Sequence, residues 1–143
     1  MRDRFIGVWK LISCERRSAD GRVEYPYGEH PLGRITYDTA GRMSALLMRQ
    51  GRKSTVPPGT GLVAGKASCE ELREVLDGFT AYCGTFDVDE AAHTVIHHVQ
   101  IGVAPSWVGT DLRRTYRFDE NRVTLTAHTG GASIDLVWER EAG

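Results

Sequence analysis

The sequence has few cysteines and prolines, no long apolar run and almost no net charge. It contains 3 Cys and 5 Pro among 143 residues. The cysteines Cys14, Cys69 and Cys83 are odd in number and show no CxxC spacing, so neither a zinc ribbon nor a disulfide framework is supported. No stretch approaches the ~18 consecutive apolar residues that a spanning helix needs. We therefore expect no membrane partner.

The charges are balanced, with 18 Lys plus Arg against 19 Asp plus Glu and a net charge of -1. Nucleic-acid-binding proteins normally carry a basic excess on one face, and no such excess exists here. The first residues also lack the ~7–15-residue apolar run of a signal peptide. We expect a cytoplasmic protein that does not bind nucleic acid.

The composition is that of a globular chain, because 41% of the residues are hydrophobic and 26% are charged. This length favours a single domain over residues 1–143 that folds without metal ions or disulfides, and we expect no cofactor. Glycine is abundant, with 16 residues, which is typical of the turns and strand bends of closed all-β folds.

Alternation of apolar and polar residues dominates the chain, and a period of two is the signature of strands. Strands are expected at 8–18, 34–38, 42–50, 82–88, 94–103, 111–118, 122–128 and 132–140. About eight strands in meander order, with short hairpins, favour an all-β, closed up-and-down antiparallel barrel.

Two of these strands carry patterns that need interpretation. In the first, Trp9 and Leu11 share one face, and Ile12 and Cys14 share the other. In the strand 42–50, Met43, Ala45 and Leu47 compete with Leu46 and Met48 for the core, so its inward face stays open.

One short helix interrupts the strands. Ser68 can cap it with Glu71 at the N3 position, and apolar residues then recur at helical spacing, which predicts a helix over 69–79. The preceding segment, 51–66, holds two prolines and four glycines and is expected to be a long loop. It is a candidate lid over a site.

Several segments together resemble a known family. They are Gly33–Tyr37, Gly41–Ala45, Tyr82–Phe86, His97, Pro105–Gly109, Arg114–Tyr116 and Leu136–Arg140. In this order they are similar to the bacterial and fungal lipocalin-like domain family of single-domain, calycin-type barrels. The resemblance implies a lipocalin-like barrel in which Trp9 seals one end and Arg140 lies over its ring, a contact favoured by the attraction between a cation and an aromatic face.

The interior candidates follow from strand parity. His97 shares a face with Val95, Val99 and Ile101, whereas His98 lies on the other face. On the next strand Arg114 and Tyr116 lie on the apolar face, so we expect both to enter the same cavity as His97. An inward Arg is costly unless it is paired, and no Asp or Glu lies on the inward parity of nearby strands. Either Arg114 reaches solvent at a barrel end, or an anionic or carbonyl-bearing ligand completes it. The alternative is a polar cluster that only fixes the strand register.

Three functional hypotheses follow. The first is binding of a small hydrophobic molecule with a carbonyl or acidic group. The candidate ligand-binding residues are Tyr37, Met43, Tyr82, Phe86, His97, Arg114 and Tyr116. The second is a cofactor-free isomerase or cyclase, with His97 as candidate catalytic acid–base and Arg114 stabilising an oxyanion. The third is a module that forms a homodimer through the Ile12–Cys14 face or the helix.

Other chemistries find little support in the sequence. Five histidines invite a metal site, but His97 and His98 are adjacent in a strand and face opposite sides, and the others have no ligand-like spacing. No GxSxG elbow is present, and Cys69 has no base that the sequence identifies. We therefore expect neither a metal site nor a nucleophilic enzyme.

Overall fold

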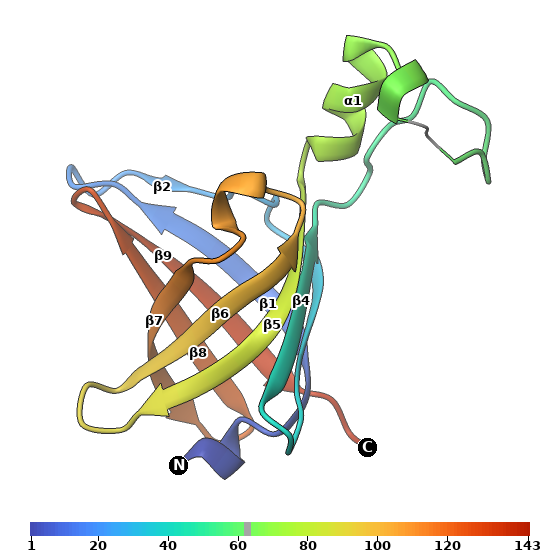
Figure 1. The fold of residues 1–143 in the computed structure, drawn as a ribbon. Coiled ribbons are helices and arrows are strands. Elements are labelled where there is room, and N and C mark those ends of the chain that lie inside the picture. The colour runs from blue at the N-terminus through green and yellow to red at the C-terminus, as the bar shows by residue number, and fades with distance from the viewer. Residues whose placement is uncertain (62–63) are drawn as a thin grey trace.

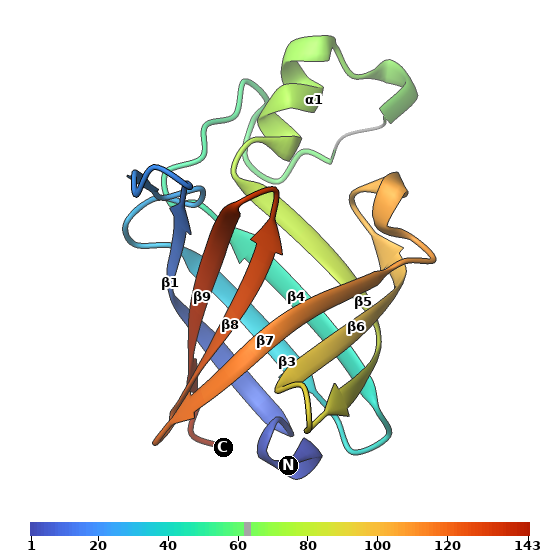
Figure 2. The ribbon, with the colours of Figure 1, turned by 90° about the vertical axis from the view of Figure 1, so that its left-hand side faces the viewer.

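Antiparallel strands make up most of the chain in the computed structural model, which describes residues 1–61 and 64–143. The strands are β1 (Gly7–Arg17), β2 (Val23–Glu24), β3 (Leu32–Tyr37), β4 (Arg42–Met48), β5 (Phe79–Asp89), β6 (Thr94–Gly102), β7 (Asp111–Asp119), β8 (Arg122–Thr129) and β9 (Ala132–Arg140). They follow the order β2-β1-β3-β4-β5-β6-β7-β8-β9, and pairing of β1 with β9 closes the sheet (Figures 1 and 2). Within the described residues, eight strands form the ring and β2 only extends the end of β1. The predicted closed up-and-down barrel is confirmed.

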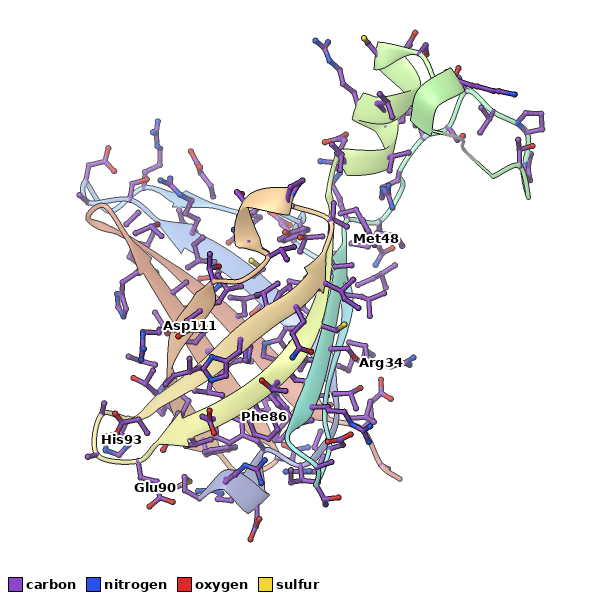
Figure 3. All side chains as sticks on the ribbon, in the orientation of Figure 1. Arg34, Met48, Phe86, Glu90, His93 and Asp111 are labelled. Carbon is purple, nitrogen blue, oxygen red and sulfur yellow. The ribbon has the colours of Figure 1, made fainter. Side chains whose placement is uncertain are left out.

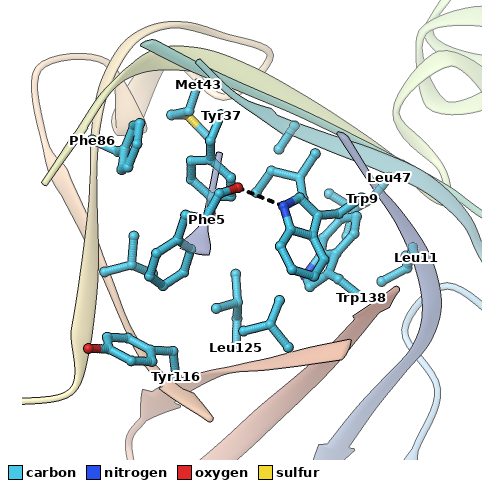
Figure 4. Close-up of a cluster of buried hydrophobic side chains, with 14 residues drawn as sticks. Phe5, Trp9, Leu11, Tyr37, Met43, Leu47, Phe86, Tyr116, Leu125 and Trp138 are labelled. Carbon is cyan, nitrogen blue, oxygen red and sulfur yellow. Dashed lines mark hydrogen bonds between the residues drawn. The ribbon is translucent and has the colours of Figure 1, made fainter. Parts of the chain in front are cut away.

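Aromatic side chains fill one end of the barrel. The short 3-10 helix η1 (Arg2–Arg4) covers this end and delivers Phe5, which is fully buried (Figures 1 and 4). The Phe5 ring meets that of Tyr37 edge to face, with centroids 5.4 Å apart, and its carbonyl accepts a 2.8 Å hydrogen bond from Trp9 Nε1. This packing leaves no room for a ligand at that end.

Arg140 closes the same end from outside. Its guanidinium carbon lies 4.1 Å from the centre of the Trp9 ring, and Nη1 donates to the carbonyl of Ile6 at 2.6 Å. Gly7 makes the approach feasible, because its φ is +132° and a Cβ there would come within 2.7 Å of Arg140 Nη1. The guanidinium of Arg140 thus links the last strand to the N-terminal segment.

The inward face of β4, which the sequence left open, is now assigned. Met43, Ala45 and Leu47 are buried, whereas Leu46 is 48% exposed on the outside. The register with the neighbouring strands explains the choice, because Ala45 pairs with buried Ile35 on β3, and antiparallel partners share a face.

Two strand irregularities overturn predictions made from simple alternation. The register of β1 against β9 shifts between Leu11 and Ser13, so Leu11 and Cys14 are both buried although they were expected on opposite faces. In β6 the shift falls opposite Cys83 and Gly84, and Ile101 turns outward with 69% exposure instead of sharing the inward face of His97. An extra residue in one strand reverses the parity that follows it. The expected Ile12–Cys14 surface for dimerisation is therefore wrong, since Cys14 lies inside.

The predicted helix forms but is shorter than expected. Helix α1 spans Cys69–Leu76, and the Ser68 side chain accepts the hydrogen bond from the Glu71 amide at 3.2 Å, as the capping pattern indicated. The end predicted at Phe79 is wrong. The backbone leaves the helix at Asp77, which is extended, Gly78 follows with a φ of +63°, and Phe79 opens β5 opposite Met48.

The segment between β4 and β5 extends past the other, open end of the barrel (Figures 1 and 2). It contains α1 and the 3-10 helix η2 (Ala64–Lys66), and residues 62–63 of the expected loop lie outside the described residues. The apolar side chains Leu72, Val75 and Leu76 remain exposed on α1. No helix in the described residues is long and apolar enough to cross a membrane.

Candidate functional site

The open half of the barrel holds a cavity of about 350 Å³. Its walls are mostly apolar and include Ile35, Leu47, Leu112, Leu125, Ala127 and Ile134 from the inner faces of the strands. A volume near the lower end of the ~300–1,000 Å³ typical of small-molecule sites suits a small ligand. Among the described residues of the segment 51–66, none lines this cavity, so a lid role for that segment stays a prediction.

A second hollow, of about 410 Å³, lies on the outside of the barrel between β3, β4 and β5. Its apolar lining includes Leu32, Leu46 and Met48, and its rim carries Arg34. That guanidinium is already engaged, because its Nη2 lies 3.3 Å from the Glu141 carboxylate. Lys10 also lines the outer hollow, but the inner cavity is the better candidate site because the inner faces of the strands bring Tyr82, His97 and Arg114 to one cavity.

His97 is the central polar group of the inner cavity. Its Nε2 lies 2.7 Å from the Tyr37 hydroxyl and its Nδ1 lies 2.8 Å from the Tyr82 hydroxyl. The imidazole is 1% exposed, so both ring nitrogens are satisfied inside the protein. The three side chains come from β3, β5 and β6. Tyr37 is 60 residues from His97 in the chain, and Tyr82 is 15 residues from it.

Burial keeps this cluster neutral. It lowers the pKa of His97 to about 3, with the nearby positive charge of Arg114 acting in the same direction. Burial likewise raises the pKa of Tyr37 well above its ordinary value and that of Tyr82 to about 12, while Arg114 opposes both shifts. Near neutral pH the imidazole and both phenols are uncharged, and Arg114 is the positive charge beside them.

Arg114 lines the cavity and is half-buried. Its Nη1 donates to the carbonyl of Arg113 at 3.0 Å, and no carboxylate in the described part of the chain lies within ion-pair distance. A partly buried guanidinium without an anion is unfavourable unless water or a ligand completes its hydrogen bonds. This is the feature of the site that most directly indicates a bound group.

The structure separates the residues expected in the cavity into two sets. Tyr82, His97 and Arg114 line it, and Tyr37 stands directly behind His97. The remaining three, Met43, Phe86 and Tyr116, lie in the packed end of the barrel and do not line the cavity (Figure 4). Their side chains face inward, as the alternation along their strands indicates, but they lie closer to the sealed end of the barrel than the cavity does.

Many lining residues were missing from the sequence-based site, and Trp107, Tyr27 and Cys14 are among them. Trp107, in the 3-10 helix η3 (Pro105–Trp107), meets the Tyr82 ring edge to face at 5.6 Å. Tyr27 follows β2, and Cys14 enters through the bulge of β1. The aromatic residues within Pro-punctuated loops were the available signal for Trp107 and Tyr27. Nothing in the alternation could have indicated Cys14.

His98 belongs to the outer surface, as predicted. Its Nδ1 lies 2.6 Å from Asp111 Oδ1 and its Nε2 lies 2.8 Å from Asp87 Oδ2, with Asp111 at the surface in Figure 3. The two carboxylates bind opposite ring nitrogens, so the three groups do not converge on a common point. In residues 1–61 and 64–143 no three His, Cys, Asp or Glu side chains are placed to hold a metal ion.

The barrel fold agrees with the result of a comparison of this sequence with known protein families. A family model described as a lipocalin-like domain matches residues 6–140. The chain belongs to the lipocalin-like domain family. No curated protein sequence matches this lipocalin-like chain.

Two solved structures that resemble this lipocalin-like protein do so only distantly. A lipocalin-like protein from Bacteroides uniformis ATCC 8492 aligns with a TM-score of 0.48 and 11% identity, over 96% of this chain and 99% of that one. As-p18, an extracellular fatty acid binding protein, aligns with a TM-score of 0.45 and 15% identity, over 97% of both chains. Similarities at this level carry no information about the ligand of this chain.

Proposed function

We propose that this lipocalin-like barrel binds a small hydrophobic molecule that carries a carbonyl or acidic group. Its apolar part would lie against the aliphatic walls of the 350 Å³ cavity, where burial of hydrocarbon supplies most of the affinity. Its oxygen atoms would lie near Arg114, the charged side chain of the lining.

The unpaired guanidinium of Arg114 is the observation that carries this proposal. It lines an apolar cavity, and no described carboxylate forms an ion pair with it. An oxygen with negative or partly negative charge would complete its hydrogen bonds, and hydrogen bonds from a charged donor are stronger than those between neutral groups. The ligand would thus supply the partner that the described residues do not.

The alternative, an isomerase or cyclase using His97 as acid–base, gains less support from the same geometry. A general base needs a nitrogen within reach of the proton that it removes. Both ring nitrogens of His97 are occupied by the hydroxyls of Tyr37 and Tyr82, and its pKa is lowered to about 3 by burial. This geometry favours ligand binding over proton exchange through His97.

Displacement of a fluorescent hydrophobic anion, anilinonaphthalene sulfonate, by medium-chain fatty acids tests the proposal. We expect the wild-type barrel to bind the dye and to release it to the acids. Arg114→Gln should weaken binding of the acids by roughly 10- to 100-fold, because it removes a charged hydrogen bond.

Arg113→Gln is the matched control. Arg113 is the neighbouring residue on β7, is exposed, and points away from the cavity toward Asp111. It should leave binding unchanged. Equal loss of affinity in both variants would show that the effect is one of overall charge and would contradict a site at Arg114.

A further inference from the structure

The proton on the neutral His97 ring must lie on one particular nitrogen, and this decides which neighbouring hydroxyl is left with a free hydrogen. The inference drawn from it concerns the chemical class of the ligand and rests on the proposed function. A neutral imidazole has one N–H donor and one bare nitrogen acceptor. Two arrangements of the chain Tyr37–His97–Tyr82 are therefore available. In one, Nδ1 carries the proton, and in the other, Nε2 carries it.

Burial of Tyr37 selects between them. Its side chain is 1% exposed and does not line the cavity, and its hydroxyl makes one hydrogen bond in the described structure, to His97 Nε2. If Nε2 carried the proton, the Tyr37 oxygen would accept it and the Tyr37 hydroxyl hydrogen would have no acceptor. A buried donor without a partner is costly. Tyr37 must therefore donate to a bare Nε2.

The proton of His97 is then on Nδ1, where it is donated to the Tyr82 oxygen at 2.8 Å. That contact uses Tyr82 as an acceptor, so the hydrogen of its own hydroxyl remains free. Tyr82 lines the cavity, unlike Tyr37. The free O–H is therefore available to a ligand in the cavity, which Arg114 also lines.

The two groups together form a donor-only corner. The Arg114 guanidinium cannot accept a hydrogen bond, and the Tyr82 oxygen already accepts one from His97. The indole N–H of Trp138, another lining residue, is also buried without an acceptor. Three further hydroxyls that can accept a hydrogen bond also line the cavity, those of Tyr27, Thr80 and Thr129.

We propose that the ligand is a carboxylate, with one oxygen accepting the Tyr82 hydroxyl and the other accepting the Arg114 guanidinium. A carboxylate has two acceptor oxygens and no donor, which matches this corner. An alcohol has a hydroxyl hydrogen that neither Arg114 nor Tyr82 can accept. An aldehyde has a single oxygen and no charge. An ammonium group has only donors and would lie beside another cation. Tyr37 acts as a positioning residue, because it sets the direction without touching the ligand.

The first experiment reads the direction without any ligand. Two-bond proton–nitrogen correlation spectra of the ¹⁵N-labelled full chain distinguish the two neutral tautomers of a histidine ring. The His97 signal is recognised because it stays neutral across the pH range in which ordinary histidines titrate. We expect the proton on Nδ1. A proton on Nε2 would overturn the inferred direction.

The second experiment uses four probes with the same eight-carbon chain: octanoic acid, octanal, 1-octanol and octylamine. We expect octanoate to bind at least ~10-fold more tightly than the other three, because only it satisfies both donors. An alcohol that binds as tightly as the acid would overturn the proposal. If none of the four binds, the proposed function itself fails for this ligand size, while the tautomer measurement still stands.

Three variants separate positioning from contact. Tyr82→Phe should remove most of the preference for octanoate over 1-octanol, because the free hydroxyl is lost. Tyr37→Phe should also reduce the preference for octanoate over 1-octanol, and the His97 proton should no longer be confined to Nδ1. A loss of packing alone would not produce both effects. Tyr25→Phe is the control, since Tyr25 is 42% exposed and lies outside the cavity.

Discussion

The Cα of Gly84 lies against the backbone carbonyl of His98, so closely that a Cβ at this position would overlap the carbonyl oxygen. Gly84 is buried at the bulge where β6 carries one extra residue opposite β5. We predict that Gly84→Ala lowers the free energy of unfolding by at least ~1–3 kcal/mol, because the two strands must separate. Urea unfolding followed by circular dichroism measures this change.

Gly61→Ala is the matched control, since Gly61 is exposed and nothing lies within 4 Å of an added Cβ. Its effect should stay within ~0.5 kcal/mol. If the two alanine variants were equally stable, the close approach at Gly84 would be wrong.

His98 predicts a pH dependence of stability. Its hydrogen bonds to Asp111 and then to Asp87 raise its pKa, and they link β5, β6 and β7. Because the folded pKa lies above the unfolded value of ~6.5, the stabilisation is complete below ~6.5 and is lost as the pH rises through the folded pKa. Urea unfolding at a series of pH values should show the advantage of the wild type over His98→Gln shrinking with rising pH.

His128→Gln serves as the reference for that series. His128 is exposed on β8 and makes no side-chain hydrogen bond to the residues that the structure describes. It should show no comparable trend, and an advantage of His98 that grows with pH would contradict the interpretation.

Filling the cavity should abolish binding without unfolding the barrel. Ala127 is 5% exposed and lines the cavity from β8. We predict that Ala127→Phe occupies the space of the ligand and eliminates binding of the fluorescent anion, at a cost of about 1–3 kcal/mol in stability. The control Ala81→Phe adds the same ring to the outside of β5, opposite Leu46, and should still bind the anion.

The three thiols should react at very different rates. Cys69 is exposed and Cys83 half-buried, whereas Cys14 is 1% exposed and its pKa is raised to about 11, by burial first and then by Asp135 and Glu15. We predict rapid alkylation of Cys69 and modification of Cys14 only on unfolding, because the thiolate is the reactive form. Mass spectrometry of alkylated peptides over time measures this order, which rapid labelling of native Cys14 would contradict.

Period-two alternation was sufficient to orient the polar residues at the centre of the cavity. It placed His97 inward on β6 and Arg114 inward on β7, and both line the cavity. The reason is that one face of each strand must be apolar to close a barrel, so an inward polar residue stands out from its neighbours. The hydrogen bonds of His97 with Tyr37 and Tyr82 were not predicted, because they join strands distant in sequence.

Alternation failed wherever the chain departs from a regular strand. The bulge in β1 brought Cys14 inside, and the shift opposite β5 sent Ile101 outside. Parity also says nothing about depth, so Phe86 and Tyr116 were assigned to a cavity that they do not reach. The homodimer and the cytoplasmic location stay predictions.

The sequence by itself determined a closed antiparallel barrel, the capped start of its helix and the inward orientation of His97 and Arg114. These depend on local periodicity and capping, which neighbouring residues encode. Only the tertiary structure decided which end is filled and which residues line the cavity. Those properties depend on strand register and on the packing of Phe5 and Trp9 inside the ring, where residues far apart in the chain compete for one volume.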